Sequence, residues 1–275
     1  MMNKNDFAKR QANRVLRQKL KLEKTFAREL ASYFAEQKRR KKTGKEISSI
    51  KPVLERHYKR IVKEFTGVKI KQDVQNKISE SFEFIIAGKA QQRAEEIDKI
   101  TEDRWKRSIQ AARDQEPDAT EETLLLIALQ IFRNYNKNRV QTISISETQT
   151  VSESVRFEIT KAVHLEMEQI ILEQNRQRAK ELYDLSGDYT SYQIYNEIDI
   201  KPEAILTGLL LTAKKKWMTM GDARVRDIHN AANGQEQYYL EPYQVGGELL
   251  MFPGDGSLGA SAKNLVNCRC VSVGL

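Results

Sequence analysis

The sequence predicts an α+β fold, made of a predominantly helical N-terminal body and a small C-terminal α+β domain. In the first two thirds of the chain, apolar residues recur every three or four positions, as on one face of an amphipathic helix. The chain of 275 residues contains only five prolines, which agrees with long helices. We expect a basic helical region at 1–137, a long helical segment at 138–187 and a compact α+β domain at 188–275.

Glycine, proline and charged runs divide the helical part into amphipathic stretches. The expected helices span 7–40, 50–65, 74–88, 93–113, 120–136 and 138–183, the last as one helix or two. The stretch at 120–136 is the most apolar, so we expect it at the centre of a helical bundle. Trp105 falls on the apolar face of its helix and is expected in the core, whereas His57 is expected at a solvated rim. His164 is expected to be partly buried.

The C-terminal part changes character, with short extended segments separated by Gly-Gly and Pro-Gly turns. Strands are expected at 204–220, 237–240, 248–252 and 266–273, around one short helix. Asp222 is placed to cap the N-terminus of that helix, and Gly234 to end it. Trp217 is expected to pack the incoming strand against this helix.

Positive charge is concentrated at the N-terminus. Residues 1–71 hold 22 Lys and Arg against 7 Asp and Glu, whereas the net charge of the whole chain is +8. The densest run is Lys38, Arg39, Arg40, Lys41, Lys42 and Lys45. This run is expected to contact double-stranded DNA or an acidic protein surface, and the alternative is a solvated helix face. No signal peptide or membrane-spanning stretch is apparent, so no membrane partner is expected.

A second constellation gathers near the C-terminus. Asp222, Arg226 and His229 are spaced to share one helix face, and Cys268 and Cys270 would lie on the same side of a strand. Two cysteines separated by one residue do not form a disulfide framework. Three interpretations stay open: a hydrogen-bonded structural lock, a metal site built from His229, Cys268 and Cys270, or a thiol nucleophile with His229 as its base. The metal would be structural zinc, completed by Asp222 or water, and the sequence requires no other cofactor.

The order of these motifs resembles the head-morphogenesis family of tailed bacteriophages, typified by a phage Mu F-like domain. The resemblance rests on Trp217, Asp222, Arg226, His229, Gly234, the turn Pro253-Gly254-Asp255 and the terminal run Asn267 to Cys270. A weaker upstream match runs through Arg139, Ile143 and Glu147, which the resemblance places facing the C-terminal domain. It covers residues 138–275.

The resemblance implies a minor head (capsid) protein of a tailed phage or prophage and no enzymatic activity. Such a protein binds the portal during procapsid assembly, with scaffold or capsid protein as further partners, and influences DNA packaging or ejection. It would reside in the host cytoplasm during assembly and then inside the virion head. Effector domains that follow the motif in some relatives are not expected here, because the sequence ends at Leu275. The alternative function is non-specific DNA binding through the basic N-terminal helices.

Overall fold

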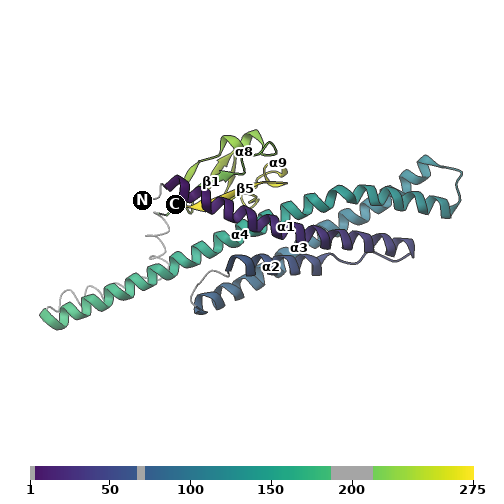
Figure 1. The fold of residues 1–275 in the computed structure, drawn as a ribbon. Coiled ribbons are helices and arrows are strands. Elements are labelled where there is room, and N and C mark those ends of the chain that lie inside the picture. Colours follow the sequence, from purple (N-terminus) through teal and green to yellow (C-terminus); the bar gives the residue numbers. More distant parts are fainter. Residues whose placement is uncertain (1–3, 67–71, 187–212) are drawn as a thin grey trace.

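The computed structural model describes residues 4–66, 72–186 and 213–275 (Figure 1). Four helices form an elongated body: α1 (Lys4–Lys42), α2 (Lys51–Thr66), α3 (Gln72–Gln115) and α4 (Glu121–Ser186). α4 packs against α1, α2 and α3. Together with the strands described below, they form the predicted α+β architecture, which is thereby confirmed. Within these ranges no helix has the length and apolar character needed to cross a membrane.

Two predicted helix breaks are wrong. α3 continues through Gly88, and α4 runs without interruption across the predicted boundary between residues 137 and 138. A glycine inside a helix costs only about 1 kcal/mol relative to alanine, which tertiary packing of the flanking turns offsets. Pro117 does separate α3 from α4, as predicted.

The apolar stretch at 120–136 does not lie at the centre of a bundle, as the sequence suggested. It forms the distal end of an α3–α4 hairpin, which extends past the end of α1 in Figure 1. Trp105 of α3 is buried there, as predicted, and meets Phe132 of α4 edge-on at 5.6 Å between ring centroids. Leu126 on the outer side is 56% exposed.

The C-terminal part contains two small antiparallel sheets. Strands β1 (Lys214–Thr219), β2 (Glu236–Tyr238) and β5 (Cys270–Gly274) form one sheet in the order β2-β1-β5, and β3 (Tyr243–Val245) pairs with β4 (Glu248–Leu250). Two short helices, α8 (Asp227–Ala231) and α9 (Ala262–Leu265), lie between strands. Each predicted strand has a shorter counterpart, whereas β3 and α9 were not predicted. Residues 204–212 of the first predicted strand lie outside the described residues.

The main core joins the two parts of the chain. Val271 and Val273 of β5 belong to the same buried cluster as Phe26 of α1 and Val151 and Val155 of α4. The last strand therefore completes the core of the helical body, and the C-terminal unit is packed onto α1 and α4.

His57 is not at a solvated rim, contrary to the prediction. Its ring is fully buried, stacks on Phe26 at 3.8 Å and shares a 2.9 Å hydrogen bond between Nε2 and the Thr148 hydroxyl. Burial, aided by the nearby Arg60 charge, lowers the pKa of His57 to about 3. The basic residues beside it in sequence occupy other faces of α2, so local sequence misled the prediction. His164 is half-buried, as predicted.

We predict that His57 makes folding stability sensitive to acid. Its folded pKa of about 3 lies below the ordinary 6.5, so between these values the unfolded chain binds more protons and unfolding becomes easier as pH falls. From about pH 7.5 to about pH 5 the loss from this group should be about 2 kcal/mol. In urea denaturation, the unfolding free energy of wild type minus that of His57→Gln should be about 2 kcal/mol smaller at about pH 5 than at about pH 7.5. His164→Gln is the control, and an equal pH dependence in wild type and His57→Gln would contradict the assignment.

Candidate functional site

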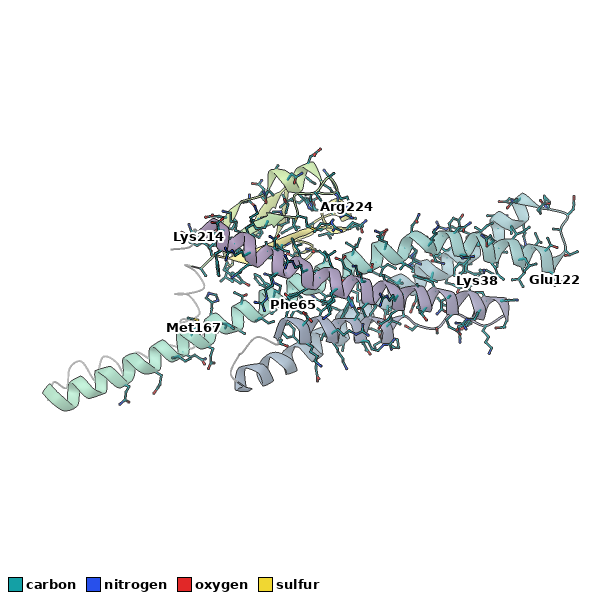
Figure 2. All side chains as sticks on the ribbon, in the orientation of Figure 1. Lys38, Phe65, Glu122, Met167, Lys214 and Arg224 are labelled. Carbon is teal, nitrogen blue, oxygen red and sulfur yellow. The ribbon has the colours of Figure 1, made fainter. Side chains whose placement is uncertain are left out.

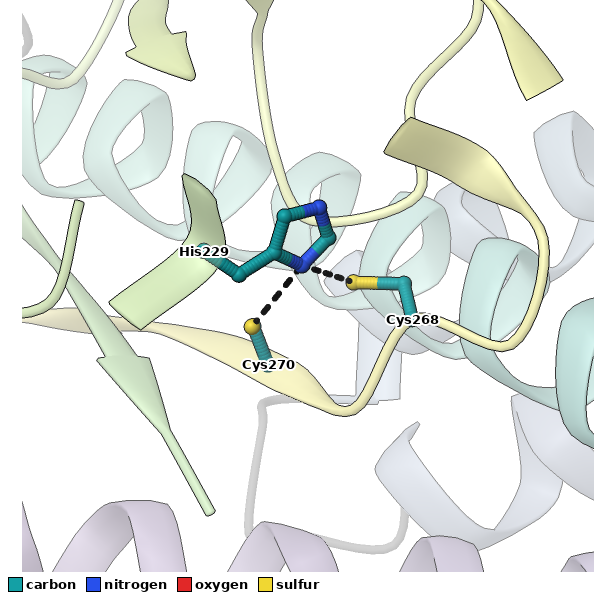
Figure 3. Close-up of side chains that lie close together, drawn as sticks. All are labelled: His229, Cys268 and Cys270. Atoms are coloured by element: carbon teal, nitrogen blue, oxygen red, sulfur yellow. Dashed lines mark hydrogen bonds between the residues drawn. The ribbon is translucent and has the colours of Figure 1, made fainter. Parts of the chain in front are cut away.

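The C-terminal unit is built around Trp217 of β1, which is fully buried. Its ring meets His229 of α8 edge-on at 5.7 Å and Tyr243 of β3 at 5.2 Å. The expectation that Trp217 packs the strand against the helix of His229 is therefore confirmed. This contact fixes α8 over the end of the sheet and directs the His229 ring toward β5 (Figure 3).

His229, Cys268 and Cys270 come together, as the metal interpretation requires. His229 Nδ1 lies 3.4 Å from Cys270 Sγ and 3.7 Å from Cys268 Sγ (Figure 3). The three possible ligand atoms lie within 4.8 Å of one another, and all three residues are buried. One histidine and two cysteines form a donor set that suits tetrahedral zinc, with a fourth position left for another ligand. The cluster can thus hold a metal ion.

A second layer of contacts sets the orientation of the imidazole. The Asn264 side-chain amide donates to the Val245 carbonyl at 3.1 Å and to Glu248 at 2.7 Å. Its oxygen therefore faces His229 Nε2, 3.1 Å away, and accepts the ring N–H. In the neutral ring, this bond places the proton on Nε2 and leaves the Nδ1 lone pair directed at both thiols. Fixing one ring nitrogen by a hydrogen bond so that the other can bind is typical of metal-ligating histidines.

The thiols also differ in their electrostatics. A hydrogen bond from the Cys270 thiol, which outweighs the effect of burial, lowers the pKa of Cys268 to about 5, whereas the same contact raises the pKa of Cys270. The buried indole N–H of Trp217 makes no hydrogen bond of normal geometry, but it lies near enough to the Cys270 sulfur to lower the pKa of that thiol. A thiolate at Cys270 would supply the acceptor that this donor lacks. Metal binding, which deprotonates thiols, would create one.

Cys268, His229 and Asn264 also follow the hydrogen-bond order of a papain-like Cys-His-Asn triad. In the catalytic interpretation Asp222 was to orient the imidazole, but Asn264 holds that place. A nucleophile must meet a substrate, and both thiols and the imidazole are at most 2% exposed. Burial therefore favours a structural role for this cluster over a catalytic one.

Asp222 and Arg226 do not share a helix face with His229, so that prediction is wrong. α8 begins only at Asp227, and Arg226 is its N-cap residue without a side-chain cap. Asp222 instead accepts a 3.1 Å hydrogen bond from the Arg224 backbone N–H and pairs with the Arg224 and Arg269 side chains. Arg226 donates to the Val266 carbonyl, beside the Asn267–Cys270 run. The expected helix is shorter because residues 222–225 form a turn, in which the Val225 N–H donates to the Asp222 carbonyl at 3.0 Å.

Gly234 lies just beyond α8 at φ +85°, a conformation that favours glycine, and its N–H donates to the Trp217 carbonyl at 2.8 Å. Asn267 adopts φ 54° and turns the chain into β5. Its N–H donates to the Ser146 hydroxyl of α4 at 3.1 Å. Both residues therefore shape the backbone around the cluster.

A buried polar seam joins the edge strand β5 to α4. Gln149 donates to the Cys270 carbonyl at 2.9 Å, Glu153 accepts the Ser272 N–H at 3.0 Å, and Arg156 donates to the Ser272 carbonyl at 2.8 Å. These side chains stand where the next strand of the sheet would be. They satisfy backbone groups that an edge strand otherwise leaves unpaired.

Lys19 of α1 closes this seam. It forms a fully buried ion pair with Glu153 and a 2.9 Å hydrogen bond with the Gln149 side-chain oxygen. Burial lowers the pKa of Lys19, whereas the charges of Arg156 and Lys19 overcome the effect of burial and lower the pKa of Glu153. Glu153 is thus held ionised between two cations and a backbone N–H.

The Pro253-Gly254-Asp255 turn docks on the same helix. Gln149 donates to the Pro253 carbonyl at 3.0 Å, and the Thr150 hydroxyl donates to that of Gly254 at 3.2 Å. A β-carbon at Gly254 would lie 3.2 Å from the Gln149 side chain and 3.3 Å from the Thr150 hydroxyl, at φ +87°. Asp255 caps the turn through the backbone N–H groups of Met251 and Ser257. The turn therefore needs glycine for its close approach to α4.

Arg139 faces the helical body, whereas the family resemblance placed it toward the C-terminal domain. Glu147 binds helical partners but lies at the boundary, in a cavity that Gly254 and Leu265 of the C-terminal unit also line. Arg139 donates to the Thr101 hydroxyl at 2.9 Å, and Glu147 binds Arg93 at 2.6 Å and the Tyr58 hydroxyl at 2.6 Å. The other face of the same α4 segment, with Ser146, Gln149 and Thr150, contacts the C-terminal unit. The upstream match therefore marks a helix that lies between the two parts of the molecule.

The predicted basic run divides into residues with different surroundings. Lys41 pairs with Glu102 at 2.8 Å and lies over the Trp105 ring, and Arg40 donates to the Glu46 carbonyl at 2.6 Å. These two cations are therefore used inside the molecule. Lys42 and Lys45 are exposed, while Lys38 and Arg39 line a groove between α1 and α4.

A longer basic surface lies on α1 and was missed by the sequence argument. Exposed cations follow one another three or four residues apart, on one face over about 27 Å of helix. We call them the α1 basic stripe, and they are Arg10, Arg14, Arg17, Lys21, Lys24 and Arg28. Within the described ranges none of the six forms an ion pair. Their periodic spacing was the signal that could have identified them.

Comparisons with known proteins assign no class to this chain. No protein-family model, no curated protein and no solved structure matches it. The similarity to the head-morphogenesis family therefore stays a prediction, and the function has to be argued from the site itself.

Proposed function

We propose that this chain is a minor head protein of a tailed phage or prophage that binds the portal protein during procapsid assembly. One observation carries the proposal: the upstream segment that resembles the head-morphogenesis family packs against the terminal run Asn267–Cys270, across a sequence separation of 121 residues. In the upstream segment, the Ser146 hydroxyl accepts a hydrogen bond from the Asn267 N–H of the terminal run. The Gln149 side chain, three residues further on, donates a hydrogen bond to the Cys270 carbonyl. A motif whose separate pieces form one folded unit is better explained by a shared fold than by chance spacing.

The arrangement suits an assembly role. The C-terminal unit is compact and joined to a long helical body, so it can present a rigid surface to the portal, with scaffold or capsid protein as further partners. The burial of the cysteine–histidine cluster supports a structural purpose, and we propose no catalytic activity. In this account the protein acts in the host cytoplasm during assembly and then in the virion head, where it influences packaging or ejection of DNA.

Non-specific DNA binding is the second candidate function, and the α1 basic stripe favours it. Six exposed cations on one helix face match the charge of a phosphate backbone and need no base contacts. Binding of this kind weakens by roughly a thousandfold between low and physiological salt when six phosphates are contacted. A portal interface that buries apolar surface would depend much less on salt.

We further propose that His229, Cys268 and Cys270 hold a structural zinc ion. Two observations suit a metal bound by two thiolates and His229 Nδ1. Asn264 forms a hydrogen bond with His229 Nε2, and the Trp217 N–H lacks an acceptor of normal geometry that a Cys270 thiolate would supply. Zinc there would link α8 to β5, whose sheet is too small to bury a large apolar core of its own. It would add stability through folding-coupled binding.

We predict that the full-length chain co-elutes with the portal protein encoded beside it, at both low and high salt, in size-exclusion chromatography. Arg17→Glu/Lys21→Glu, which reverses two charges of the α1 basic stripe, should leave co-elution intact. The DNA-binding alternative would be favoured by two results together. Wild type would fail to co-elute with the portal protein, and it would bind DNA at low salt whereas this variant would not. A full-length chain is needed because cutting at residue 137 would divide α4.

We predict about one zinc ion per chain after purification under reducing conditions, measured by elemental analysis. Cys268→Ser should lose the zinc and lower the unfolding free energy by roughly 3 kcal/mol when free zinc is at about a hundred times its dissociation constant. His229→Gln should do the same, with His164→Gln as its control. In the zinc-bound protein both thiols should resist alkylation by iodoacetamide, which a catalytic thiol would not. A metal-free wild type whose stability is unchanged by added zinc would refute the zinc site and leave the hydrogen-bonded lock.

A further inference from the structure

A groove of about 930 Å³ lies between the C-terminal half of α1 and residues 130–140 of α4. Its floor is apolar and contains the buried rings of Phe34 and Phe132 and the half-buried Val140. Ala31 and Ala35 line it from exposed positions on α1. The exposed apolar atoms of such a groove, on Ala31, Ala35 and Val140, are removed from water only by a ligand with apolar groups of its own.

The rim of the groove is cationic on both sides. Lys38 and Arg39 stand on α1, and Arg133 and Lys137 stand one helical turn apart on α4. Arg39 pairs with Glu36, whereas the other three cations form no ion pair with any residue that the structure describes. Like charges gathered around one groove repel, and an acidic ligand would relieve this repulsion.

Beyond the groove, α4 offers an apolar surface that leads to the tip of the hairpin. Figure 2 places Lys38 on the end of α1 beside this hairpin, with Glu122 at its tip. The stretch 124–129 is apolar on every side, although α3 covers only part of it and leaves Leu126 56% exposed. A helix that is apolar all round is normally buried all round. Leu126 lies four and seven residues before Gln130 and Arg133, on the same face of α4, so a cover over Leu126 would continue along the groove.

We propose that the α1–α4 groove binds an acidic amphipathic helix of a partner protein. Leucine-like side chains of that helix would enter the apolar floor, and its carboxylates would pair with Lys38, Arg133 and Lys137. In helix-in-groove recognition, apolar side chains three and four residues apart on the bound helix insert into a groove such as this one, which is bounded by two helices. DNA fits this surface less well, because its phosphate backbone has no apolar groups to place against Ala31, Ala35 and Val140. The inference is independent of the portal proposal.

The test uses the full chain and a fluorescein-labelled peptide with leucines at heptad a and d positions and glutamates around them, read by anisotropy. A peptide of the same composition, scrambled to have no apolar face, is the control probe. Arg133→Glu/Lys137→Glu should weaken binding at least about tenfold. Ala35→Trp should weaken it similarly, because it fills the groove and keeps every charge. Lys21→Glu/Lys24→Glu, on the α1 basic stripe, should leave binding unchanged, and circular dichroism verifies that each variant folds.

Several results would overturn the proposal. Equal binding of the scrambled peptide, or unchanged binding in Ala35→Trp, would show that charge alone attracts the probe. Duplex DNA could also compete with the peptide. If Arg133→Glu/Lys137→Glu abolishes this DNA binding but Ala35→Trp does not, the cations bind nucleic acid. Alternatively, the wild type binds no peptide and forms concentration-dependent dimers that Leu126→Glu dissociates. That result would assign the surface to a second copy of this chain.

Discussion

The structure depends on how the free edge of β5 is satisfied. An edge strand in a protein interior leaves N–H and C=O groups that cost free energy unless they are paired. Here Gln149, Glu153 and Arg156 of α4 pair with them, and Lys19 of α1 neutralises Glu153 from the opposite side. A buried ion pair contributes little by itself, but removing one partner leaves an uncompensated charge. The seam therefore specifies one position of β5 on the helices.

Two consequences follow from that position. Cys270 is a member of the seam through its carbonyl and of the candidate metal site through its thiol, so the docking of β5 and the geometry of the cluster are coupled. The valines of β5 complete the core of α1 and α4, which makes the C-terminal unit part of one cooperative structure. The cationic surfaces on α1 lie outside this core, where a partner can reach them without disturbing it.

Periodicity in the sequence predicted the helical body and the small C-terminal sheet, because helical and strand patterns are local properties. Helix breaks at Gly88 and residue 137 were wrong, since a continuous packed face outweighs local signals. The burial of His57 and the seam of Lys19, Gln149 and Glu153 could not be predicted, because the partners are brought together only by the fold. The cluster of His229, Cys268 and Cys270 was predicted correctly, whereas Asn264, which orients it, was missed because its spacing carries no signal.

The central claim is that β5, α1 and α4 form one cooperative unit held by the seam. Native-state hydrogen exchange of wild type and Glu153→Ala, followed by mass spectrometry, tests it most directly. The account predicts that exchange accelerates together in β5, in α1 around Lys19 and in α4 around Gln149, while the distal α3–α4 hairpin is unaffected. Faster exchange confined to β5, with α1 and α4 as protected as in wild type, would contradict the claim and make the C-terminal unit a separate domain.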